Sequence, residues 1–147
     1  MMPELNIFAI IVAALVPSIF GAIYYGPLAE SAWLKSLGRT KEEMKPNNPA
    51  VTYGLALLMA LLLSFTMKMV IEMVHKDVND AGELILGSTH TFGHGAFHGL
   101  FMALTLIVPV IVSLSLFQKS SAKNILLNAV FWIVTMSIMG GILDAWN

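Results

Sequence analysis

The chain has 147 residues, of which 57% are hydrophobic and only 12% charged, and its net charge is −1. A soluble domain carries about 25% charged residues, so this composition excludes an ordinary water-soluble surface. Basic residues are not in excess, which excludes nucleic acid as a partner. The absence of cysteine excludes disulfides, zinc–thiolate sites and thiol nucleophiles.

Four stretches without Asp, Glu, Lys or Arg follow one another along the chain. They cover residues 5–29, 46–67, 84–118 and 124–143, which are 25, 22, 35 and 20 positions long. About 20 apolar residues cross the hydrocarbon core of a bilayer as a helix. Continuous apolar runs also exclude the alternating pattern of a membrane barrel. The sequence therefore predicts an all-α, integral membrane four-helix bundle in the lipid bilayer, formed by a single domain over residues 1–147.

The first predicted span covers residues 7–25, and a short interfacial helix follows it over residues 28–38. Trp33 lies on the apolar face of this short helix, and Gly38 is placed to end it. Thr40 and Glu43 have the spacing of a capping box, which favours another turn in the same loop.

Three further spans are predicted over residues 51–70, 94–117 and 125–144. Lys68, at the end of the second span, is expected to extend outward to the headgroups, where it can also pair with Glu72. Asp144 ends the fourth span, where we expect it to be a solvated end residue. Within that span, Asn128 and Thr135 are expected to hydrogen-bond a neighbouring helix.

The basic residues predict the orientation of the chain. Six of the eight lie in the loops after the first and third spans, and only Lys68 and Lys76 lie toward the opposite side. Because short cytoplasmic loops carry an excess of Lys and Arg, these two loops are predicted to be cytoplasmic. Both termini are then expected on the outer side.

Histidines form the one unusual chemical pattern. His90, His94 and His98 are spaced by four, which on a helix confines them to an arc of about 80°. The ends of the other spans supply further groups at the same depth. The candidate metal ligands at this outer mouth of the bundle are therefore His94, His98, His90, His75, Glu72 and Asp144.

Three interpretations of this cluster remain open. Imidazoles and carboxylates suit Zn, Fe, Cu or Ni, although no cofactor is certain. Alternatively, the histidines sense or move protons. In the third interpretation, which base rates favour, Gly95 and Gly99 allow a close helix approach and the histidines hydrogen-bond across it.

No sequence motif for catalysis is present. No Glu follows His90 or His94 as a metallopeptidase motif requires, and no phosphate-binding glycine loop or nucleophile elbow occurs. We therefore predict no catalytic residues, and we expect an accessory protein rather than an enzyme.

The segment GAIYYGPLAESAWLKSLGRTKEEM resembles the start of the bacterial domain-of-unknown-function 1761 family, and HGAFHG and NAVFWIVTMSIMGGI are also similar to members of it. The resemblance implies a four-helix membrane protein of a bacterial inner (cytoplasmic) membrane and implies no activity. We expect a scaffold or accessory subunit, with another copy or another membrane protein as candidate partner. The alternative is a metal-binding or metal-transporting protein.

Overall fold

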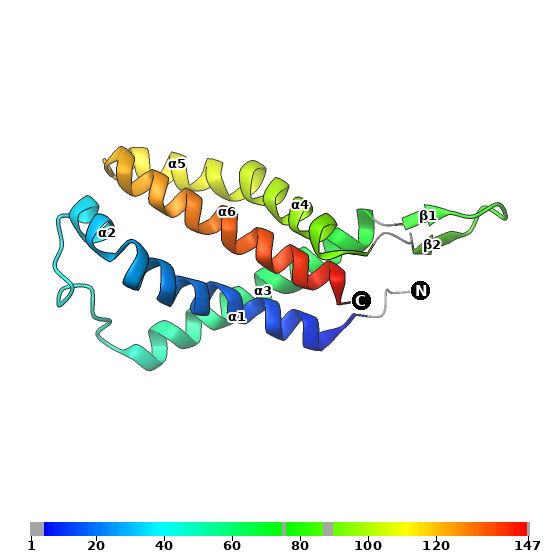
Figure 1. Cartoon of the computed structure of the whole chain (residues 1–147), viewed down its shortest axis with the longest axis horizontal. Helices are drawn as coiled ribbons and strands as arrows, with labels where there is room; N and C mark the ends of the chain where they lie inside the picture. The colour runs from blue at the N-terminus through cyan, green and yellow to red at the C-terminus, as the bar shows by residue number, and fades with distance from the viewer. Residues whose placement is uncertain (1–4, 75, 87–89, 147) are drawn as a thin grey trace.

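The computed structural model describes residues 5–74, 76–86 and 90–146 (Figure 1). It is a bundle of helices with one small β-hairpin. Its elements are α1 (Ile7–Ile23), the π-helical turn η1 (Tyr24–Leu28), α2 (Glu30–Leu37), α3 (Pro49–Val74), β1 (Lys76–Val78), β2 (Leu84–Leu86), α4 (Phe92–Met102), the π-helical turn η2 (Ala103–Ile107), α5 (Val108–Phe117) and α6 (Ala122–Ala145).

Four helical segments are long and apolar enough to cross a membrane, which confirms the predicted all-α bundle and marks a multi-pass membrane protein. Two of them combine several elements, because η1 continues α1 and η2 joins α4 to α5. The predicted short helix is also present as α2, and Gly38 ends it with a left-handed φ of 63°. The four segments are Ile7–Leu28, Pro49–Val74, Phe92–Phe117 and Ala122–Ala145.

The two ends of the bundle differ in what they carry. At one end, here called the hairpin end, α1 begins, α6 ends, and the hairpin connects α3 to α4 (Figure 1). At the opposite end, here called the α2 end, α2 follows the first span and α5 turns into α6. The predicted orientation would place the hairpin end outside, and this stays a prediction.

The hairpin was not predicted. β1 and β2 pair antiparallel, with Lys76 opposite Leu86, and Asn79 Oδ1 accepts hydrogen bonds from the backbone N–H of Ala81 at 3.0 Å and of Glu83 at 2.9 Å. Strands of three residues are too short to show a period-two pattern, so the sequence signal was too weak to find them.

A close backbone contact joins α4 to α6. A Cβ atom at Gly99 would lie 2.0 Å from the carbonyl oxygen of Met136, and one at Gly95 would lie 2.2 Å from that of Gly140. No side chain fits at such distances, so the backbones come this close only because positions 95 and 99 are glycines. This is the small-residue packing on which membrane helices rely, and it confirms the close approach predicted for Gly95 and Gly99.

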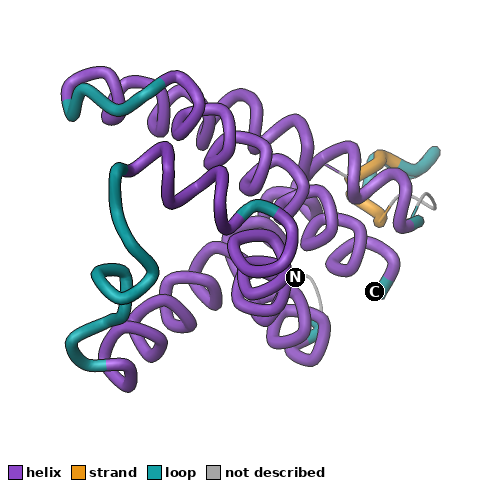
Figure 2. The backbone as a smooth tube through the Cα atoms, turned by 60° about the vertical axis from the view of Figure 1, so that its left-hand side comes forward, coloured by secondary structure: helices purple, strands orange, loops and turns teal. Residues whose placement is uncertain are grey.

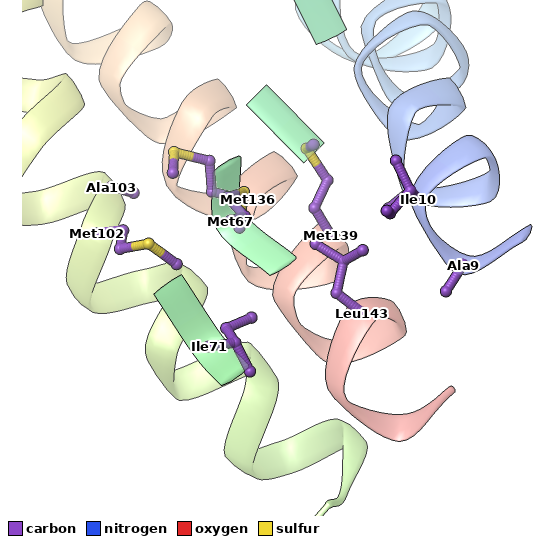
Figure 3. Packing of buried hydrophobic residues seen from close by; sticks show 10 residues of the cluster. Ala9, Ile10, Met67, Ile71, Met102, Ala103, Met136, Met139 and Leu143 are labelled. Carbon is purple, nitrogen blue, oxygen red and sulfur yellow. The ribbon is translucent and has the colours of Figure 1, made fainter. Parts of the chain in front are cut away.

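Packing is concentrated toward the hairpin end. The hydrophobic core there combines α1, α3, α4 and α6 and includes four methionines, Met67, Met102, Met136 and Met139 (Figure 3). In contrast, every residue of α3 from Pro49 to Met59 is exposed. This half of α3 diverges from the other helices (Figure 2). The bundle is therefore closed at one end and open along the first half of α3.

Candidate functional site

Ionisable side chains from two helices are buried at the hairpin end. Lys68 and Glu72 of α3 and Asp144 of α6 are each at most 1% exposed. Lys68 Nζ lies 2.7 Å from Glu72 Oε1 and donates a hydrogen bond to the carbonyl oxygen of Leu143 at 2.9 Å. The last carbonyls of a helix lack partners within the helix and carry partial negative charge. Lys68 therefore caps the end of α6 from a neighbouring helix.

Two predictions about these residues are wrong. Lys68 does not extend outward to the headgroups, because the Glu72 carboxylate and the Leu143 carbonyl bind its ammonium inside the bundle. Its predicted pairing with Glu72 is confirmed. Asp144 is not a solvated end residue but is fully buried, because the glycine contact brings α4 over it. A Cβ atom at Gly95 would lie only 2.3 Å from the Asp144 Cβ.

Two histidines share the Asp144 carboxylate. His90 Nδ1 lies 3.0 Å from Oδ1 of Asp144, and His94 Nδ1 lies 3.3 Å from Oδ2. The carboxylate is fully buried, whereas the side chains of His90 and His94 are 18% and 33% exposed. The site therefore presents imidazoles toward the outside of the bundle and keeps the acid within it.

The start of α4 positions these histidines. Thr91 is the N-cap of α4, and its Oγ1 accepts the backbone N–H of His94 at 3.2 Å. His90 therefore precedes the helix, and only His94 and His98 have the predicted helical spacing of four. The ring of His98 lies edge-on to that of His94, with 4.6 Å between the ring centres.

The predicted metal site finds no support in residues 5–74, 76–86 and 90–146, where no three His, Asp or Glu side chains are placed to hold a metal ion. His90, His94 and Asp144 do meet, with His98 beside them, but Glu72 is engaged by Lys68. His75, the sixth candidate, lies outside the described residues. Lys68 was paired with Glu72 from the sequence but was not included among the candidate site residues.

At the α2 end the hydrogen bonds that join η1, α2 and α6 are neutral. Tyr25 Oη donates to Asn128 Oδ1 at 2.6 Å, which confirms the helix contact predicted for Asn128. Asn128 Nδ2 donates to Asn124 Oδ1 at 3.1 Å, and Asn124 Nδ2 donates to Ser36 Oγ at 3.1 Å. The same expectation for Thr135 is wrong within the described part of the chain, where its buried Oγ1 has no hydrogen-bond partner.

Comparison with known proteins identifies a family. A family model described as "Protein of unknown function (DUF1761)" matches residues 8–144, nearly the whole chain. No curated protein and no solved structure matches the chain significantly.

Proposed function

The chain belongs to the DUF1761 family of unknown function, as its motifs predicted, and from this premise we propose that it is a non-enzymatic membrane protein that acts as a scaffold or accessory subunit. One observation carries the proposal. The buried ionisable groups of the hairpin end bind one another and a backbone carbonyl of the same bundle, so their contacts hold helices together.

A scaffold also needs a surface that another membrane protein can use. The first half of α3, from Pro49 to Met59, is exposed on every face, whereas one face of the second half is packed into the core. Within a membrane, such a segment contacts lipid or another protein's helix. Association between membrane helices depends on packing, and Gly54 leaves space for a close approach because no atom lies within 4 Å of its Cβ position.

Photo-crosslinking in native membranes tests this proposal. A photoreactive residue would replace Tyr53 or Leu58 in the exposed half of α3, and Leu143 in the core would serve as the control position. We expect one discrete protein adduct from the α3 positions and none from position 143. Adducts with lipid alone at both α3 positions would contradict a role through helix–helix contacts along this segment.

A second candidate function, a response to pH, follows from the charges of the same cluster. Among the residues that the structure describes, its fully buried ionisable groups are the ammonium of Lys68 and the carboxylates of Glu72 and Asp144. Nδ1 of His90 and Nδ1 of His94 each lie within hydrogen-bond distance of the Asp144 carboxylate, and histidine is the side chain on which proteins commonly build responses to pH. Because Asp144 is on α6 and the histidines are on or beside α4, a change in the charge of this group would act on the contact between these two segments.

The pH response and the metal alternative are separated by one experiment. The purified protein and a His90→Ala/His94→Ala variant would be compared for metal content and for thermal stability across about pH 5–8. A response to pH predicts that the difference in stability between the wild type and the variant changes across this range, with equal metal content. Near-stoichiometric metal in the wild type, lost in a folded variant, would instead overturn both the scaffold and the pH proposals.

A further inference from the structure

A cavity of about 420 Å³ lies at the α2 end, outside the cluster described above. Pro27 of η1 and Ala29 and Ser31 at the start of α2 line one part of it, and Lys35 of α2 and Lys123 of α6 line the rest. Residues almost 90 positions apart in the sequence thus meet around one space.

Hydrogen bonds hold the two sides of this cavity together. Ser121 Oγ, at the N-cap of α6, donates to the carbonyl oxygen of Ser36 in α2 at 3.1 Å. Asn124 Nδ2 donates to Ser36 Oγ at the same distance. The backbones that carry the lysines of α2 and α6 are therefore held in a fixed relation to each other.

The cavity carries an unbalanced positive charge. Its one acid, Glu30, binds Lys41 with 2.6 Å between Oε1 and Nζ, and this contact raises the pKa of Lys41. Neither Lys35 nor Lys123 has a carboxylate within 4.0 Å among the residues that the structure describes. Within the described residues, no side chain caps the first turn of α2, whose positive end adds to the same field. An anion is the ligand that this charge would accept.

The position of the cavity indicates which kind of anion it would bind. The first span ends at Leu28 and the fourth begins at Ala122, so the cavity lies at the boundary of the apolar spans. Leu28 is 68% exposed, and Phe117, which ends the third span at the same end of the bundle, is 91% exposed. Acyl chains would cover such apolar surfaces. Basic pockets beside membrane helices suit the headgroups of anionic lipids.

We propose that this cavity binds the phosphate of an anionic phospholipid between Lys35 and Lys123. The ammonium groups compensate the phosphate, and the acyl chains extend along the exposed apolar residues of the spans. This assignment does not depend on the scaffold proposal, because it uses none of the residues of the hairpin end or of the exposed half of α3.

Lipid binding to the full-length protein tests the proposal. Delipidated protein in detergent would be titrated with phosphatidylglycerol or phosphatidylcholine, and bound lipid would be counted by native mass spectrometry. The test variant is Lys35→Gln/Lys123→Gln. The matched control is Lys45→Gln/Lys119→Gln, which removes the same charge from loops at the same end but outside the cavity. A Lys35→Arg/Lys123→Arg variant keeps the charge.

We expect the wild type to prefer phosphatidylglycerol, and the test variant to bind it about 30-fold more weakly, as the loss of two lysines near an anionic surface implies. The control and the arginine variant should keep the preference. Equal weakening of both glutamine variants would overturn the proposal, as would equal binding of the two lipids. Displacement of the lipid by inorganic phosphate at matching concentration would show that the site binds free phosphate and would overturn the lipid assignment.

Discussion

The two ends of this bundle hold their helices together with different chemistry. At the hairpin end, α3, α4 and α6 are joined through Lys68, Glu72, Asp144 and two histidines. At the α2 end, η1, α2 and α6 are joined through tyrosine, asparagine and serine side chains. Neutral hydrogen bonds hold at any physiological pH, whereas buried charges hold only while each has its partner. The difference teaches that helices are joined through ionisable side chains at the hairpin end and through neutral side chains at the α2 end.

The largest effect should come from breaking the buried ion pair. Lys68→Met removes the partner of Glu72, whose carboxylate is 1% exposed, and leaves the carbonyl of Leu143 uncapped. We expect a loss of about 3–5 kcal/mol in the free energy of unfolding, measured by titrating a denaturing detergent into mixed micelles. The double variant Lys68→Met/Glu72→Leu should recover most of this loss. An equally unstable double variant would show that the pair does not account for the effect.

A smaller loss should follow from separating α4 and α6 without touching a charge. Gly99→Ala places a Cβ atom 2.0 Å from the Met136 carbonyl oxygen, so the helices have to move apart. We expect a loss of about 1–3 kcal/mol in the same unfolding measurement. Gly54→Ala is the matched control, because open space surrounds that position, and it should change stability little. Similar losses in both variants would contradict the glycine contact.

A weaker effect is expected at the neutral end. Tyr25→Phe removes the hydroxyl that donates to Asn128 at 2.6 Å and keeps the ring that packs against Phe131 and Trp33. The free energy of unfolding should fall by about 1 kcal/mol, by the same amount across about pH 5–8. A loss that varied with pH in this range would break the contrast between the two ends.

The smallest effect belongs to the exposed loop after α2. Glu43 accepts hydrogen bonds from the backbone N–H and hydroxyl of Thr40, and these lower the pKa of its carboxyl from 4.5. The turn is therefore stabilised above the ordinary pKa of Glu, and this contribution disappears as pH falls through the lowered pKa. The amide resonance of Thr40 should shift with that titration in the wild type and stay constant in Glu43→Gln. A constant wild-type resonance would show that the capping box does not form.

Apolar runs made the spans predictable, since length and hydropathy alone decide which segments cross a membrane. The burial of the ionisable side chains was harder to predict. Whether Lys68 points to lipid or into the bundle depends on the rotation of α3 and on the carbonyl of Leu143, which lies 75 positions away. The burial of Asp144 likewise depends on α4 lying over it at Gly95. The spacing of side chains within one helix predicts neither the direction of Lys68 nor the burial of Asp144.

The pairing of Lys68 with Glu72 has a consequence for biogenesis. Synthesis proceeds from the N-terminus, so α3 enters the bilayer before α6 exists, and Lys68 then lacks the Leu143 carbonyl that it caps in the finished protein. An isolated lysine opposes insertion of a helix into the membrane. Because Glu72 lies one turn away on the same helix, it can neutralise Lys68 as soon as α3 forms. The ion pair thus compensates the charge of Lys68 within α3 until α6 has been inserted.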